Sequence, residues 1–183
     1  NPRDIDVRTD FRGWATVTID GEPARAFDAA ISIDRLSNGN FWLGVHIADV
    51  AHYVPEGSAL DREAYERGTS VYFPERAVHM FPSELATGLC SLNPHVDRLV
   101  QSVLMEVDRR SGAVVRYELH DGVIHSDERM TYHDWNAILT DRDPAMLARY
   151  EPLVPMFERM HELFEILHAR RRRRGSIDFD LQD

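Results

Sequence analysis

Cysteine is nearly absent from the 183-residue chain, which carries the single thiol of Cys90. A lone cysteine cannot form an internal disulfide, and Cys90 has no CxxC partner, so a disulfide framework and a thiolate zinc site are both excluded. Such a thiol is more often a small buried hydrophobe than a nucleophile. We expect a reducing, cytoplasmic setting.

Long hydrophobic runs are missing as well. No stretch approaches the roughly 20 consecutive apolar residues that a membrane helix needs. The first ten residues, NPRDIDVRTD, lack the apolar core of a signal peptide. The sequence therefore predicts a soluble, untargeted chain with no membrane partner.

Basic residues are outnumbered, with 21 Lys and Arg against 31 Asp and Glu and a formal charge of −10. This balance argues against a protein that binds polyanions through its overall charge, so any nucleic acid must be bound locally. Five arginines at residues 170–174 form the one low-complexity feature. They fit either phosphate binding or stabilisation of a helix C-terminus.

Strand-like alternation dominates the first two thirds of the chain. The Asn-Gly pair in LSNGN (36–40) predicts a hairpin, and residues 110–112 predict a turn within a second antiparallel pair. Ser58 and Gly68 are typical of the start and end of a short surface helix. The expected strands are WATVTI (14–19), AISI (30–33), FWLGVHIADV (41–50), TSVYFP (69–74), LVQSVLMEVD (99–108) and VVRYELHDGVI (114–124).

The apolar period changes after Pro144. A spacing of 4, 3, 4 and 3 residues predicts one long helix that ends near Gly175 and packs on the sheet. Its apolar face would consist of Leu153, Phe157, Met160, Phe164 and Leu167. The last segment, SIDFDLQD (176–183), is strand-like again. We expect a mixed α/β fold with a largely antiparallel sheet and peripheral helices.

Two aspartates stand at neighbouring strand ends. Asp20 closes one predicted strand before a turn at Gly21, and Asp28 begins the next. Clustered carboxylates hold the hard divalent cations that assist phosphodiester hydrolysis. An aspartate beside glycine is more often a turn residue, so the spacing alone does not establish a metal site.

Five longer segments carry more information because they occur in a fixed order at characteristic intervals. They are TIDGEPARAFDAAI, GVHIADVAHYV, GSALDREAYERGTSVYFPER, MFPSELATGLCSLNP and RRRGSIDFDL. Together they resemble the catalytic domain of the ribonuclease II and ribonuclease R family, the RNB domain. The resemblance covers nearly the whole chain and implies that residues 1–183 are the N-terminal half of that domain.

The resemblance implies a processive 3′ to 5′ exoribonuclease. Members of this family feed single-stranded RNA along a channel to a Mg²⁺ site and release nucleoside 5′-monophosphates. Mg²⁺ is therefore the expected cofactor, with Mn²⁺ as an alternative, and single-stranded RNA is the expected partner.

The family's acidic motif contains four aspartates, spaced as D, five residues, then DxDD. Asp20 and Asp28 match two of them and are the expected catalytic residues and metal ligands, whereas Ala26 and Ala29 occupy the other two positions. Alanine offers no oxygen to a cation, and losing members of a catalytic unit commonly costs several orders of magnitude in rate. We expect impaired activity, through natural degeneration or deliberate Asp→Ala changes.

Tyr72 matches a family aromatic that stacks on a base near the RNA 3′ end, the substrate-binding role expected here. Without the resemblance, the sequence would favour a structural role for Tyr72, as an aromatic side chain of a strand packed in the hydrophobic core. His46 and Asp49 would point to opposite faces of a strand, which favours structural roles over shared metal binding. Ser91 and Asn93 are candidates for hydrogen bonds to RNA phosphates. His79 stands where the family usually has proline.

Two other functions remain open. One is a non-catalytic RNA-binding or scaffold protein that keeps the RNA channel without its chemistry. The other is a fragment that assembles with a complementary chain carrying the rest of the domain.

Overall fold

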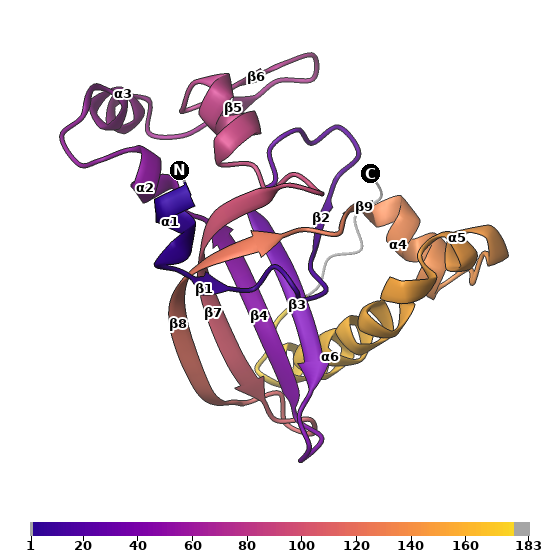
Figure 1. Cartoon of the computed structure of the whole chain (residues 1–183). Coiled ribbons are helices and arrows are strands. Elements are labelled where there is room, and N and C mark those ends of the chain that lie inside the picture. Colours follow the sequence, from indigo (N-terminus) through magenta and orange to yellow (C-terminus); the bar gives the residue numbers. More distant parts are fainter. Residues whose placement is uncertain (1, 178–183) are drawn as a thin grey trace.

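A seven-stranded sheet forms the centre of the molecule (Figure 1). The computed structural model describes residues 2–177. The strand order is β1-β8-β7-β4-β3-β2-β9, and β1 and β2 pair in parallel with β8 and β9, whereas all other pairings are antiparallel. The expected largely antiparallel sheet is confirmed. Its strands are β1 (Thr9–Asp10), β2 (Val17–Asp20), β3 (Ala29–Arg35), β4 (Phe41–Ala48), β7 (Asp97–Val107), β8 (Val114–His125) and β9 (Glu128–Thr131).

Two hairpins build the middle of the sheet, and both were expected from their turns. Gly39 lies at φ +84° between β3 and β4, and Gly112 lies at φ +67° between β7 and β8. Glycine adopts this left-handed conformation without the steric cost that a Cβ atom would bring. These local signals therefore set the register of the four central strands.

Helices cover one face of the sheet and one of its ends (Figure 1). Ser58 caps the predicted surface helix by accepting a hydrogen bond from Asp61 N, and Gly68 ends it at φ 71°. No helix within residues 2–177 is long and apolar enough to cross a bilayer. The helices are α1 (Pro2–Asp6), α2 (Val50–Tyr53), α3 (Ala59–Arg67), the π-helix η1 (Glu84–Leu89), α4 (Tyr132–Leu139), α5 (Pro144–Arg149), the 3-10 helix η2 (Glu151–Leu153) and α6 (Val154–Arg173).

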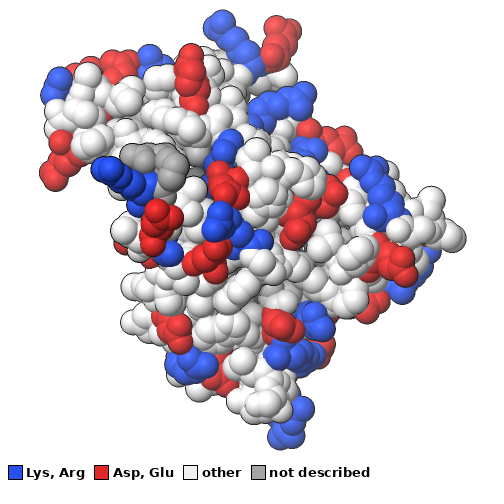
Figure 2. All heavy atoms as spheres, in the orientation of Figure 1, with Lys and Arg blue, Asp and Glu red and all other residues white. Residues whose placement is uncertain are grey.

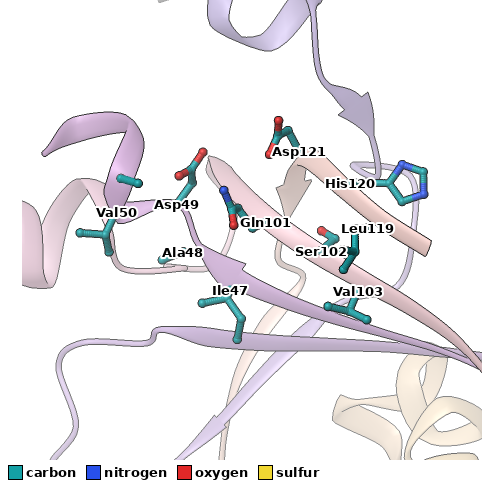
Figure 3. A pocket seen from close by; sticks show the side chains of 11 residues that line it. Ile47, Ala48, Asp49, Val50, Gln101, Ser102, Val103, Leu119, His120 and Asp121 are labelled. Atoms are coloured by element: carbon teal, nitrogen blue, oxygen red, sulfur yellow. The ribbon is translucent and has the colours of Figure 1, made fainter. Parts of the chain in front are cut away.

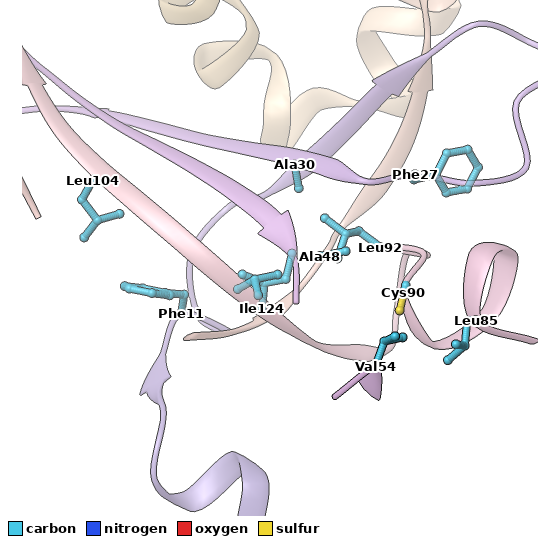
Figure 4. Close-up of a cluster of buried hydrophobic side chains, with 11 residues drawn as sticks. Phe11, Phe27, Ala30, Ala48, Val54, Leu85, Cys90, Leu92, Leu104 and Ile124 are labelled. Carbon is cyan, nitrogen blue, oxygen red and sulfur yellow. The ribbon is translucent and has the colours of Figure 1, made fainter. Parts of the chain in front are cut away.

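The sheet has a hydrophobic core on each face. One core lies under the α2 and η1 region and includes Phe11, Phe27 and Leu104 (Figure 4). The other packs the opposite face against α4, α5 and α6, with Phe41 and Phe157 fully buried. Burial of one such side chain stabilises a fold by about 1.5–3 kcal/mol, so these cores fix the sheet that carries the strand ends.

Three sequence expectations differ from the structure. The predicted helix from Pro144 to Gly175 is broken into α5, η2 and α6, because Pro152 and Pro155 each lack the amide hydrogen that a continuous helix needs. Phe164 is 52% exposed and so does not belong wholly to the core. The strand TSVYFP shortens to β5 (Val71–Tyr72), which pairs only with β6 (Ala77–Val78).

Helix α4 was not expected from the sequence. The Thr131 hydroxyl accepts a hydrogen bond from Asp134 N at 3.0 Å, so the two residues form its N-terminal cap. The predicted strand SIDFDLQD lies mostly outside the described residues.

Candidate functional site

The two aspartates expected at the site lie at the open end of the β2–β3 pair. Asp20 is the last residue of β2, and Asp28 directly precedes β3. Val17 pairs with Ile31 in this antiparallel pair, and the chain between the two strands forms a loop that has Asp20 at one end and Asp28 at the other.

The electrostatics of Asp20 support this proximity. Partial burial is the main cause that raises the pKa of the Asp20 carboxyl, the charge of Asp28 raises it further, and Arg129 opposes both. Asp20 Oδ2 and the hydroxyl of Thr18, two residues earlier, are buried and make no hydrogen bond of good geometry with the described residues, although Thr18 lies close enough to Asp20 to lower its pKa. Oxygen atoms that lack donors suit a hard cation.

Arg129 fixes the loop that joins the two aspartates. From β9, its guanidinium donates hydrogen bonds to Gly21 O at 2.7 Å and Glu22 O at 3.0 Å. The same group lies 5.3 Å from the centre of the Phe27 ring. Sequence reasoning missed Arg129, because its place beside the loop depends on the parallel pairing of β9 with β2.

Backbone hydrogen bonds hold the other end of the loop. Phe27 N donates to Ser91 Oγ at 3.0 Å, and Leu92 N donates to Phe27 O at 2.7 Å. Ala48 N donates to Asp28 O at 3.0 Å. The CSLNP segment and the end of β4 therefore fix the position of Asp28 just before β3.

These contacts correct the expectation for Ser91, whose hydroxyl is fully buried and binds the protein backbone in place of a phosphate. Asn93 is half-buried and donates to Thr87 O at 3.2 Å. Cys90 is buried, and burial raises the pKa of its thiol, so the expectation of a structural cysteine fits the structure.

A groove of about 970 Å³ runs between the acidic loop and the β5–β6 hairpin. Ala26 lines it from the loop, and Tyr72 lines it from the hairpin. Tyr72 is 72% exposed, so its ring is available to a ligand, and the alternative of a core aromatic is wrong. Asp20 and Asp28 are not among the lining residues. His79 also faces this groove, with its ring 6.4 Å from that of Tyr72.

A second hollow of about 590 Å³ lies beside the end of β4 and the middle of β7 and β8 (Figure 3). Its most buried acid is Asp49, whose Oδ2 accepts a hydrogen bond from Arg8 at 2.6 Å. Asp49 also caps α2 through His52 N. This carboxylate is already paired and part of the fold, so the hollow offers no free acidic group at its base.

His46 is a structural residue, as expected. It is fully buried between two hydroxyls, 2.7 Å from Ser32 Oγ and 2.7 Å from Ser102 Oγ. Burial lowers the pKa of its imidazole to about 4. The expectation that Asp49 lies on the same strand is wrong, because β4 ends at Ala48 and Asp49 begins the next helix.

Charge is mixed over one face of the molecule. Acidic and basic side chains alternate across the face shown in Figure 2, so no single-sign field covers that face. Arg170 of the arginine run donates to Gly112 O at 2.6 Å, which ties α6 to the β7–β8 turn.

No group of three or more His, Cys, Asp or Glu side chains within residues 2–177 is placed to hold a metal ion. The acidic site at the end of the β2–β3 pair therefore consists of two residues, Asp20 and Asp28.

Comparison with known proteins places this geometry in a family. The model of the RNB domain matches residues 8–183. The chain belongs to the RNB domain family. Two curated relatives are similar to this RNB chain along most of its length: ribonuclease R 1 of Lactococcus lactis is 50% identical over 173 residues, and ribonuclease R of Thermotoga maritima is 51% identical over 175 residues.

These alignments cover 94% and 96% of the RNB chain but only 21% and 24% of the two relatives. A solved structure, Mycoplasma genitalium RNase R in complex with ribose methylated single-stranded RNA, superposes with a TM-score of 0.82 at 32% identity. That match covers 93% of this chain and 26% of the other. The chain thus spans about a quarter of the length of the proteins it matches.

Proposed function

We propose that this chain is part of a 3′ to 5′ exoribonuclease that hydrolyses single-stranded RNA to nucleoside 5′-monophosphates, with its activity impaired at the acidic motif. Residues 1–183 would be the N-terminal half of the catalytic domain. Membership of the RNB family supports the reaction class. The observation that carries the assignment of the site is a buried Asp20 oxygen without a hydrogen-bond donor, on a carboxyl whose pKa the nearby charge of Asp28 raises.

The residues present fit one Mg²⁺ or Mn²⁺. Asp20 and Asp28 would hold it, since Mg²⁺ keeps several waters and often takes only one or two protein carboxylates. When bound there, such an ion would supply charge neutralisation for the phosphodiester and activation of water. The methyl groups of Ala26 and Ala29 provide no oxygen, so a second ion has no protein ligands at these positions. This difference is the physical reason for the proposed impairment.

The surrounding residues have separate tasks in this proposal. Tyr72 would stack on a base of the RNA, an interaction worth about 1–3 kcal/mol that tolerates any sequence because every base has a π-face. Arg129 would keep the loop between the two acids in one conformation through its two carbonyl contacts. The exposed ring of Tyr72 and the position of Ala26 share one groove, which is consistent with RNA passing between them.

The test restores the missing acids. The chain and the double variant Ala26→Asp/Ala29→Asp are incubated with 5′-labelled single-stranded RNA and Mg²⁺ or Mn²⁺. We expect shortening from the 3′ end to increase strongly in the restored variant, because two carboxylates are returned to the ion site. Ala145→Asp/Ala148→Asp serves as a matched control, since it adds the same charge at exposed positions of α5. Equal rates in the two double variants would contradict the proposal.

The second candidate is a non-catalytic RNA-binding or scaffold protein. The alanines at positions 26 and 29 favour it, because they carry no ligand oxygen while the loop keeps its contacts to Arg129 and Ser91. RNA binding without shortening in both the chain and the restored variant would support this candidate. The complementary-chain alternative would be supported by a different result. In that case the chain alone does not bind RNA, and binding appears when a chain that carries the rest of the domain is added. The cytoplasmic setting stays part of the proposal.

A further inference from the structure

One face of the β5–β6 hairpin forms a wall of the groove that Tyr72 lines. The hairpin is a two-stranded sheet of its own, separate from the seven-stranded sheet (Figure 1). Val71 pairs with Val78 and Tyr72 pairs with Ala77. Tyr72, Ala77 and His79 line the groove, whereas the two valines do not. Because side chains alternate between the faces of a strand, Tyr72 and His79 project from the same face of the hairpin.

The two rings on this face are neighbours. The imidazole of His79 lies edge-on to the ring of Tyr72, with the ring centres 6.4 Å apart and the ring planes at 87°. Tyr72 is exposed and His79 is half-buried, so a ligand in the groove can reach both rings. A base that stacks on Tyr72 therefore has the imidazole of His79 beside it.

The charged groups around His79 favour a bound anion. Arg25 lines the groove from the acidic loop, and Glu75 and Arg76 line it from the hairpin turn. On α3, Arg67 donates a hydrogen bond from Nη1 to His79 O at 3.4 Å. The groove lining thus carries two arginines against one glutamate, in a chain whose formal charge is −10. This local excess of positive charge suits a phosphate.

We propose that His79, in its protonated form, binds a phosphate of the RNA whose base stacks on Tyr72, so that RNA binding takes up a proton. The inference rests on the proposed function, since it needs RNA in this groove. The phosphate of a nucleotide is only one sugar away from its base, so a donor beside the stacking ring can reach it. A protonated imidazole donates from both ring nitrogens, and hydrogen bonds from a cation to phosphate are short and strong.

Histidine suits a proton-linked contact, because it is the side chain that most readily changes charge between about pH 5 and about pH 8. Arginine, glutamate and tyrosine, the other titratable residue types of the lining, ordinarily keep their charge state between about pH 6 and about pH 8. The buried His46 has a pKa of about 4, so it stays neutral in this window. A change of RNA affinity in the window therefore points to His79.

The test measures RNA binding against pH. The full 183-residue chain is titrated with a short oligouridylate that carries a dye without a titratable group, in the presence of a chelator that removes metal ions. We expect the affinity to rise about fivefold as the pH falls from about 8 to about 6. Because one more phosphate charge is then neutralised, the slope of log affinity against log salt should become steeper by about 0.7.

Three variants assign the effect to a residue. His79→Gln should bind equally at both pH values, with the affinity that the unaltered chain has near pH 8. His79→Lys, which is charged throughout, should bind near pH 8 about as well as the unaltered chain does near pH 6. His161→Gln, on α6 and outside the groove lining, is the matched control and should keep the pH dependence. A pH dependence that survives in His79→Gln, or an equal loss of affinity at both pH values, would overturn the proposal.

Calorimetry of the unaltered chain gives an independent measurement, which keeps the test valid if a substitution disturbs the hairpin. Binding heats in two buffers of different ionisation enthalpy report the protons taken up, and we expect a net uptake between zero and one proton per bound RNA. RNA binding without proton uptake would overturn this inference and leave the proposed function standing. Absence of RNA binding at every pH would overturn both.

Discussion

Replacing Asp28 by asparagine tests the proximity of the two acids directly. The charge of Asp28 is one of the two causes that raise the pKa of Asp20, and burial is the larger one. In Asp28→Asn, the pKa of Asp20 should fall but stay above its ordinary value, because burial is unchanged. The size and shape of the side chain at position 28 are nearly the same, so the change isolates the charge.

The size of this repulsion follows from Coulomb's law. Two unit charges roughly 5 Å apart repel by about 1 kcal/mol at water-like screening. Both side chains reach solvent, so the weaker, water-like value applies. We therefore expect Asp28→Asn to raise the free energy of unfolding by about 1 kcal/mol at neutral pH in the absence of divalent cations.

The sign of the pH dependence follows from the raised pKa. A carboxyl whose pKa is higher in the folded state destabilises that state when it is charged, so stability falls as pH rises through the folded pKa of Asp20. The advantage of Asp28→Asn should thus be absent at acidic pH, appear through this window, and remain constant above it. Below the window the Asp20 carboxyl is neutral, so the charge of Asp28 does not repel it.

Two measurements check the prediction. Urea unfolding of both proteins in the presence of a chelator gives the free energies at each pH, and an NMR titration of the Asp20 carboxyl carbon gives its pKa. Asp121→Asn, on an exposed residue of β8, is the matched control and should produce neither change. An unchanged pKa of Asp20 in Asp28→Asn would refute the argument that the two side chains converge.

Three further predictions concern single residues. The pKa of buried His46 lies near 4, below its ordinary 6.5, so stability should fall by about 3 kcal/mol as pH drops from 6.5 towards 4, and urea unfolding of His46→Gln should lack that loss. Arg129→Ala should lower the free energy of unfolding by about 1–3 kcal/mol, because the loop loses its two hydrogen bonds. It should also raise the pKa of Asp20 further, which NMR titration measures. An unchanged pKa of Asp20 would contradict the role given to Arg129. Tyr72→Ala should weaken binding of single-stranded RNA by about 1–3 kcal/mol in fluorescence anisotropy, whereas Tyr72→Phe should bind normally; equal loss in both would exclude stacking.

Local patterns predicted the parts of the fold that depend on neighbours in sequence. The Asn-Gly turn before β4 and the Ser58 cap of α3 each satisfy backbone requirements within a few residues, so their signals are complete in the sequence. The Thr131 cap of α4 was also local and was overlooked. The break before α6 was signalled by Pro152 and Pro155 against a periodic apolar pattern that suggested continuity.

The site itself was predicted only in part. Family resemblance gave Asp20 and Asp28, but the contribution of Arg129 depends on β9 joining β2 in parallel from more than a hundred residues away. The burial of Ser91 depends in the same way on the CSLNP segment crossing the end of the acidic loop. Pairings between distant segments leave no mark in the local period of the sequence, so such neighbours emerge only from the assembled sheet.

The central claim is that Asp20 and Asp28 hold one divalent cation between them. Titration with Mn²⁺, followed by electron paramagnetic resonance of the free ion, measures this directly. The account predicts one bound Mn²⁺ per chain, displaced by Mg²⁺ and lost equally in Asp20→Asn and in Asp28→Asn. Absence of binding, or binding that survives either substitution, would contradict it.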